Sequence, residues 1–122
     1  MPTKGASLTI ATSQQKENLA VAYGTAAAYA SLHSADPGTT GTSEISGGSP
    51  GYARKALSWT AGAVDGVVTA SATFDVPAST ATTHAGLWTA STGGTFLDKV
   101  AAVYTSQGSQ GQFIVTFTYT QG

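Results

Sequence analysis

The feature that most constrains the fold of this chain is a strict alternation of side chains near its C-terminus. Large apolar residues occupy every second position of this segment: Phe113, Val115, Phe117 and Tyr119. The positions between them are mostly threonine. A period of two is typical of a β-strand with one buried and one exposed face. At roughly 3.3–3.4 Å per residue, about nine residues would form a strand about 30 Å long.

The same periodicity recurs upstream, interrupted by residues that favour turns. The expected extended segments are 6–11 (a short strand or an arm), 26–33, 52–59, 67–76, 84–89 and 95–104. The turn signals are Asp36-Pro37-Gly38, Asp65-Gly66, Pro77 and Gly93-Gly94. Several short strands separated by such turns predict a mainly β fold, either an antiparallel β-sandwich or a jelly-roll-like barrel.

One short N-terminal helix is expected before these strands. Thr12 or Ser13 can cap it, Gln15 lies three residues after Thr12, and Gly24 occupies the place of a C-terminal capping glycine. We therefore expect a helix from residue 13 to about residue 23. Residues 1–12 are predicted to form an extended N-terminal arm, and residues 13–122 a single β-sandwich domain, since 122 residues leave room for one core.

Charged residues are scarce in this sequence. They make up 9% of the chain, with a net charge of −1, whereas about a quarter is typical. Five scattered basic residues form no electrostatic footprint for nucleic acid. The longest small-apolar stretch, residues 26–32, is too short to span a bilayer. A polar but nearly uncharged surface costs little to desolvate, so we expect the chain to bind copies of itself.

The residues that carry most enzyme chemistry are few. The chain has no cysteine and no Gly-x-Ser-x-Gly motif, and we expect His33 and His84, at a strand end and a strand start, to be rim residues. His33 and Asp36 would supply two metal ligands where zinc needs three or four. No Gly-Lys-Ser/Thr phosphate cradle occurs. The sequence predicts a non-enzymatic protein without cofactor or metal.

Three apolar residues outside the main strands are candidate assembly contacts: Leu8, Ile10 and Ile45. Leu8 and Ile10 share one side of the arm, and an extended segment can add a strand to a neighbour's exposed sheet edge. Ile45 is the only large apolar residue of the long loop 38–51, so we also expect it to pin that loop to the body.

The two tryptophans leave an alternative open. Trp59 or Trp88, with the Thr, Ser and Gly loops, could form a carbohydrate- or receptor-binding site. A tryptophan on an alternating strand is more often a core residue. We expect one buried group that contains Trp59, Leu57, Leu87 and the face of Phe113, Val115 and Phe117.

Four blocks of the sequence resemble a family of small tailed-bacteriophage proteins that carry an "LHTADPG" signature. The blocks are residues 29–38 (YASLHSADPG), 46–48 with 52–56 (SGG, YARKA), 83–88 (THAGLW) and 90–94 (ASTGG). Such proteins are labelled phage tail-fibre or minor virion proteins. The insert Ser49-Pro50-Gly51 and the longer arm depart from the family pattern.

The resemblance implies a structural role in the virion and brings no catalytic residues. It also implies a protein made in the host bacterial cytoplasm, consistent with the lack of cysteine and of an apolar leader. The sequence shows no shaft repeats or heptads, which slightly favours capsid decoration over a tail-fibre or minor tail protein. The expected partners are copies of the chain and the major capsid or tail proteins. Because phage surface subunits of this kind are frequently trimers, the resemblance implies a cyclic homotrimer.

Overall fold

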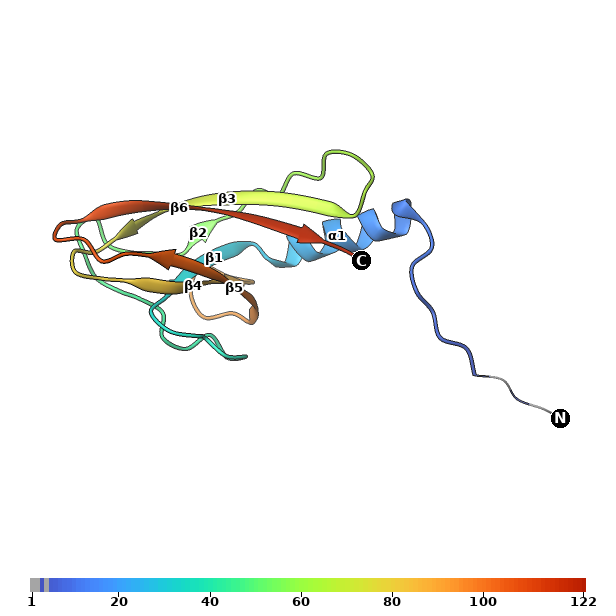
Figure 1. Ribbon diagram of the computed structural model, residues 1–122, viewed down its shortest axis with the longest axis horizontal. Coiled ribbons are helices and arrows are strands. Elements are labelled where there is room, and N and C mark those ends of the chain that lie inside the picture. The colour runs from blue at the N-terminus through green and yellow to red at the C-terminus, as the bar shows by residue number, and fades with distance from the viewer. Residues whose placement is uncertain (1–2, 4) are drawn as a thin grey trace.

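A computed structural model describes residues 3 and 5–122. These residues form one helix and six strands: α1 (Ser13–Ala26), β1 (Tyr29–His33), β2 (Lys55–Ala56), β3 (Val67–Val76), β4 (Thr82–Trp88), β5 (Phe96–Tyr104) and β6 (Gly111–Thr120). One sheet has the order β2-β1-β4-β5, and the second contains β3 and β6. All pairs are antiparallel. The two sheets lie in layers with α1 at one end (Figure 1), which confirms the predicted β-sandwich with one short helix.

The strand with the clearest alternation in the sequence, β6, pairs with β3 along its whole length. The register runs without interruption from Val67 opposite Thr120 to Val76 opposite Gly111. Val115 and Phe117 are buried on the inner face, whereas Ile114 on the outer face is 66% exposed. The predicted assignment of the two faces is therefore confirmed.

The core lies between the sheets. Phe74, Leu32 and Val76 are completely buried there. Leu87, Val115 and Phe117 belong to the same cluster, and Leu57, Trp59 and Phe113 pack against it while partly exposed. The sequence predicted that all six of these residues are buried together. They pack together, but Leu57, Trp59 and Phe113 are only partly buried. Five further members are alanines, so the two sheets pack closely across a thin core: Ala27, Ala30, Ala72, Ala85 and Ala102.

Helix α1 begins as predicted and ends later. The Thr12 hydroxyl caps it by accepting a hydrogen bond from the Gln15 backbone N–H at 3.2 Å. The prediction that Gly24 terminates the helix is wrong, because Gly24 lies inside it. A Cβ at this position would lie 2.8 Å from Cγ of Trp59, so the glycine permits close approach of that ring. The strand expected from residue 26 consequently starts at Tyr29.

The strand expected over 52–59 is reduced to Lys55–Ala56. These two residues pair with the first two residues of β1. The rest of that β1 edge is taken by the preceding loop, because the Ile45 N–H donates to the Leu32 carbonyl at 3.1 Å and Glu44 forms a bridge with His33. Residues 52–54 therefore have no strand edge to join.

Ile45 fixes the long loop to the body as expected. Its side chain is buried in the core cluster.

In the part of the chain that the structure describes, no helix is long and apolar enough to cross a membrane.

Candidate functional site

The four blocks that carry the family resemblance converge on the outer face of the four-stranded sheet, around Trp88. The indole Nε1 of Trp88 donates a hydrogen bond to the Ser31 hydroxyl at 2.8 Å. The Arg54 guanidinium lies 3.6 Å from the centroid of the indole ring, a cation–π arrangement. Phe96 packs edge-to-face on the same ring with centroids 5.1 Å apart. We call this group, together with His33 and Glu44, the signature cluster.

Arg54 joins three segments of the signature cluster. Its guanidinium contacts the Glu44 carboxylate, with Nη2 to Oε1 at 3.0 Å and Nε to Oε2 at 3.1 Å. Its Nη1 also donates to the backbone carbonyls of Ala90 at 3.1 Å and Gly93 at 2.9 Å. A planar guanidinium with five donors suits this divided role, which a lysine could not fill. Arg54 thus holds the loops 38–45 and 89–95 over Trp88.

His33 is completely buried, so the prediction that it is a rim residue is wrong. The reason is that loop 34–44 folds back over β1. The His33 Nδ1 lies 2.7 Å from the Thr42 carbonyl oxygen, and Nε2 lies 2.7 Å from the Ser31 hydroxyl. A carbonyl can only accept, so Nδ1 carries the proton and Nε2 accepts from Ser31. Burial lowers the pKa of His33 below its ordinary value and keeps the ring neutral.

The Ser31–His33 pair does not have the geometry of a catalytic pair. In a catalytic triad, the imidazole nitrogen that faces away from the serine is hydrogen-bonded to a carboxylate. In His33 this nitrogen, Nδ1, contacts the Thr42 backbone carbonyl instead. Ser31 is completely buried, and a Cβ at Gly86 would lie 2.7 Å from its hydroxyl oxygen, so a substrate has no access. The pair completes a chain of hydrogen bonds that starts at the Trp88 indole.

The two candidate metal ligands near the first block do not converge. Asp36 accepts hydrogen bonds from the Gly38 N–H at 2.8 Å, as its turn role predicts, and from Lys99 Nζ at 2.6 Å. The hydrogen bond from Lys99 holds the pKa of Asp36 below its ordinary value. Within residues 3 and 5–122, no three His, Asp or Glu side chains are grouped to hold a metal ion. His84, near the start of β4, is half-buried and contacts the neighbouring Thr83 hydroxyl at 2.8 Å.

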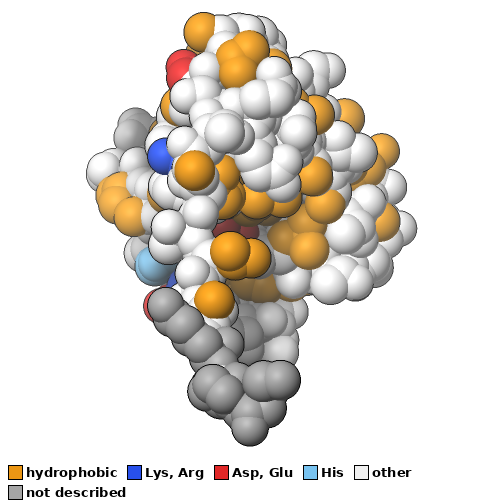
Figure 2. Space-filling model, turned by 90° about the vertical axis from the view of Figure 1, so that its right-hand side faces the viewer, with side chains coloured by type: hydrophobic (Ala, Val, Ile, Leu, Met, Phe, Trp, Pro, Cys, Tyr) orange, Lys and Arg blue, Asp and Glu red, His pale blue; other side chains and the backbone are white. Residues whose placement is uncertain are grey.

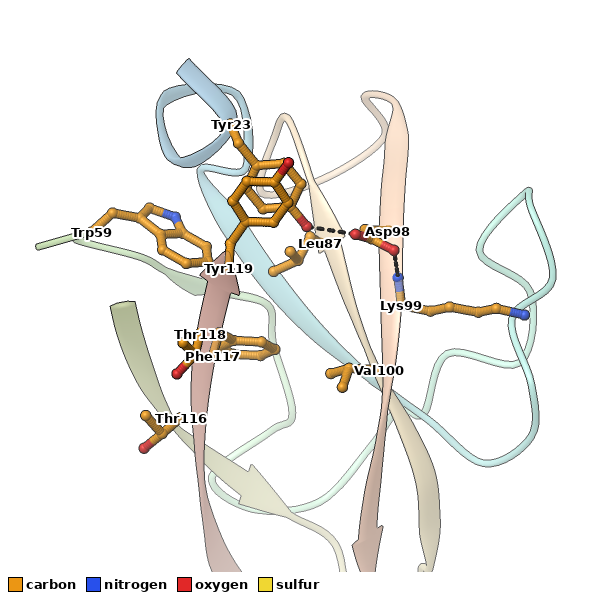
Figure 3. A pocket seen from close by; sticks show the side chains of 10 residues that line it. All are labelled: Tyr23, Trp59, Leu87, Asp98, Lys99, Val100, Thr116, Phe117, Thr118 and Tyr119. Atoms are coloured by element: carbon orange, nitrogen blue, oxygen red, sulfur yellow. Dashed lines mark hydrogen bonds between the residues drawn. The ribbon is translucent and has the colours of Figure 1, made fainter. Parts of the chain in front are cut away.

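A second region with open surface lies between β5 and β6, which we call the β5–β6 groove. Figure 3 shows Val100 of β5 and Phe117 of β6 pointing into it from opposite sides, with Leu87 further along towards Tyr119. The groove has a volume of about 200 Å³. Asp98 lies at its rim on β5. The inner walls of this groove are therefore mostly apolar.

One end of the β5–β6 groove is closed by a pair of tyrosines. Tyr23 of α1 stacks on Tyr119 with ring centroids 3.7 Å apart and planes 8° apart. Its hydroxyl donates to Asp98 Oδ2 at 2.6 Å. Burial, reinforced by the neighbouring carboxylate, raises the pKa of Tyr23 far above its ordinary value, so it remains a donor. Aromatic stacking and a charge-assisted hydrogen bond therefore fix the side chains at this end of the groove.

The candidate assembly residues fall in different environments. Leu8 is 96% exposed in the described part of the arm, which has neither helix nor strand, and Ile10 is half-buried against the start of α1. Ile45 is buried in the core of its own chain, so its side chain is not presented to a neighbour. In Figure 1 the arm extends away from the sandwich, at the end where the C-terminus also lies. The arm is thus the region where predicted assembly contacts are open to a partner.

The two tryptophans differ in how far they are buried. Trp88 is buried in the signature cluster. Trp59 is half-buried, donates from Nε1 to the Ala27 carbonyl at 2.8 Å, and lines the end of the β5–β6 groove. The contribution of Tyr23 and Asp98 to the groove was not predicted from the sequence. A signal was present, because Asp98 lies two residues before Val100 on one face of a strand.

The surface at the end that carries the arm is mostly uncharged. Figure 2 shows hydrophobic side chains scattered among uncharged polar ones on this end, with very few acidic or basic groups. Such a surface offers little electrostatic repulsion to a second copy of the chain.

The chain shows clear similarity to one known family. The model of the family described as "Podophage GP4 fiber I protein gp80" matches residues 11–121, which is nearly the whole chain. No curated protein and no solved structure matches it. The match covers the sandwich, the signature cluster and α1, and it agrees with the resemblance to phage virion proteins found in the four sequence blocks. The chain therefore belongs to the podophage GP4 fiber I protein family and is a phage fibre protein of the virion.

Proposed function

We propose that this chain is a non-enzymatic building block of a virion fibre and that its N-terminal arm attaches it to neighbouring subunits. The observation that carries this proposal is the arm itself. It precedes the sandwich domain, exposes Leu8 almost completely, and alternates apolar and polar residues. An exposed extended segment of this kind is suited to strand addition on another protein.

The structural role is supported by the state of the signature cluster. The polar side chains buried in this cluster are hydrogen-bonded, and Arg54 binds the loops that cover it. Buried polar groups that are all hydrogen-bonded in this way stabilise a fold. Membership in a fibre family supports the same conclusion.

Copies of the chain are the first proposed partners, in a cyclic trimer. The scarcity of charge, visible on the end shown in Figure 2, lowers the cost of burying this surface against itself. The particle shell or tail is the second proposed partner, since an accessory subunit must be held on the virion.

Capsid decoration is the second candidate function. One short helix and a sandwich, in the part of the chain that the structure describes, resemble a decorating domain more than a fibre shaft. The family description favours a fibre over decoration. The two candidates differ in where the chain lies on the particle.

A carbohydrate- or receptor-binding module is a weaker candidate. Trp88 is buried beneath Arg54 and cannot stack on a sugar. Trp59 is half-buried and its indole N–H is already bonded to Ala27, so only part of its ring is free for stacking. Glycan binding that disappears in Trp59→Ala but survives in Leu8→Ser would favour this candidate over attachment by the arm.

The proposal is tested by deleting residues 2–11 and measuring incorporation into particles. The deletion should leave the melting temperature nearly unchanged, because the described part of this segment adds no strand to either sheet. It should abolish incorporation. A double variant, Leu8→Ser with Ile10→Ser, should reproduce most of the loss, whereas the matched pair Ser7→Ala with Thr9→Ala should incorporate normally. Normal occupancy of the deleted chain on particles would refute attachment by the arm.

A further inference from the structure

One side of the sandwich is open, and the other is closed. On the closed side, Thr60 and Thr69 bridge the segment after β2 to β3, and Lys55 forms an ion pair with Asp75 at 3.6 Å. On the open side, β5 pairs with β4 alone and β6 pairs with β3 alone among the described strands. The open side therefore presents two strand edges whose outward N–H and C=O groups lack a strand partner.

The core is incompletely covered at this open side. Val100 lies opposite the core residue Ala85 in the sheet register, so its side chain faces inward. It is nevertheless 47% exposed, and it lines the open groove together with Phe117 of the facing sheet. Figure 3 shows the space between Val100 and Phe117 that remains. An inward-facing valine left half-exposed indicates that a further apolar group belongs there.

The size of the β5–β6 groove indicates what kind of group fits. Its volume of about 200 Å³ is below the roughly 300–1,000 Å³ of typical small-molecule sites. It is large enough for one or two aliphatic side chains. A β6 edge of ten residues, by contrast, is long enough to pair with a whole extended segment.

We propose that the arm of a second copy adds a strand to the β6 edge and places Leu8 and Ile10 in the β5–β6 groove of the first. This inference rests on the proposed function, since it names the partner and the receiving site of the arm. The two-stranded β3-β6 sheet would become three-stranded, and an isolated pair of strands is the least stable sheet. The half-exposed inner face of β5 would be covered at the same time.

The arm has the features that this groove requires. Residues 5–12 span roughly 26 Å when extended, enough to pair with most of the ten residues of β6. Leu8 and Ile10 would face the apolar walls, and Ser7 and Thr9 would lie on the outer face beside Thr116 and Thr118. Residues 5–12 contain no charged side chain, so the arm itself brings no charge into the groove. The arm joins the chain at the start of α1, whereas the groove begins at the last turn of α1, near Tyr23. This separation favours docking of the arm in the groove of a second copy over docking in the groove of its own chain.

Arm-to-groove docking joins two different surfaces and is therefore heterologous. Such contacts produce a closed ring when the rotation between copies closes, and an open filament when it does not. A ring of three copies would agree with the proposed trimer.

The absence of cysteine from the sequence permits a clean cross-linking test. One chain carries Thr9→Cys, and a second chain, with a tag that changes its mass, carries either Thr116→Cys or Thr118→Cys. Opposite residues of paired strands have Cβ atoms about 4.5–5.5 Å apart, near the range of a disulfide. The matched control is Thr83→Cys, an exposed threonine of β4 outside the groove. The mixed full-length chains are oxidised at high protein concentration, and disulfide-linked species are resolved by mass.

The expected result is a mixed dimer for Thr116→Cys or Thr118→Cys in several-fold excess over the Thr83→Cys control. Adding Leu8→Ser to the Thr9→Cys chain should reduce the yield of the mixed dimer to about that of the Thr83→Cys control. A yield equal to that of the control would overturn the inference. A chain carrying both Thr9→Cys and Thr118→Cys that forms only an internal disulfide would show docking of its own arm, which would also overturn it.

This outcome is separable from the outcome of the deletion experiment. If the deleted chain fails to load and no mixed dimer forms, the arm binds another particle protein and the proposed function stands. If the mixed dimer forms and the deleted chain still loads, the groove assignment stands and attachment by the arm is wrong.

Discussion

The signature cluster lies on the outer face of the four-stranded sheet, and the β5–β6 groove lies between the two sheets at their open side. The two regions differ in how completely their polar groups are hydrogen-bonded and their apolar groups are covered. In the cluster, Trp88 and His33 are buried and hydrogen-bonded, and Arg54 donates hydrogen bonds to a loop beside them. In the groove, Val100 is half-exposed on an inward face beside two unpaired strand edges. The residues that make the family visible in the sequence thus stabilise the fold, while the surface that is open to a partner comes from less distinctive segments.

Phe117 marks the boundary between the groove and the core, and truncating it should have the largest effect. It is buried in the core cluster and also forms a wall of the groove. Phe117→Ala should lower the free energy of unfolding by about 3–5 kcal/mol because it leaves a cavity. The matched variant Ile114→Ala, on the exposed face of β6, should cost less than about 0.5 kcal/mol. Similar losses for the two variants in urea unfolding would show that the faces of β6 are misassigned.

Arg54→Ala tests whether the signature cluster stabilises the fold. It removes a partly buried ion pair with Glu44 and two hydrogen bonds to carbonyls, so we expect a loss of about 2–3 kcal/mol. Arg54→Lys should not restore the loss, because an ammonium cannot reproduce the planar fork. The control Lys99→Ala removes an exposed ion pair with Asp36 that solvent screens, so its loss of stability should be much smaller. Equal losses for Arg54→Ala and Lys99→Ala would contradict the structural role of the cluster.

His33 should make the stability of the cluster dependent on pH. Its folded pKa is lowered, so below the unfolded value of about 6.5 the unfolded chain binds more protons than the folded chain. The contribution is therefore complete above pH 6.5 and is lost as the pH falls towards the folded pKa, by at most about 1.4 kcal/mol per pH unit. His33→Gln should remove this part of the slope in unfolding measured between pH 5 and 7.5. An unchanged slope would show that the buried ring is not kept neutral.

Val100→Thr should have the smallest effect on stability. The side chain is half-exposed in the isolated chain, so the free energy of unfolding should change by no more than about 0.5 kcal/mol. The same variant should weaken cross-linking by the arm, since it places a hydroxyl among the apolar walls of the groove. A stability loss as large as that of Arg54→Ala would mean that the groove is part of the closed core.

Elements with strong local patterns were predicted well from the sequence. The alternation of Phe113, Val115 and Phe117 identified the faces of β6, and Thr12 identified the start of α1. Gly24 was misread because a glycine that ends a helix and one that admits Trp59 look alike in sequence. The segment 52–59 was misread because residues 44–45 occupy the strand edge it would need.

The site was harder to predict than the fold because it depends on which strand edges remain unpaired. The arm and its apolar side were recognised from Leu8 and Ile10. The groove requires the sheet order, which places β5 and β6 on one open side, and this order is a long-range property. The burial of His33 was missed because a loop that covers a strand leaves no periodic signal.

A map of the assembled particle tests the central claim most directly. We predict that the chain is found in a fibre, in clusters of three, with the arm of each copy lying along β6 of the next and Leu8 and Ile10 between Val100 and Phe117. Single, unclustered copies with an empty β5–β6 groove and an arm that contacts nothing would contradict the account.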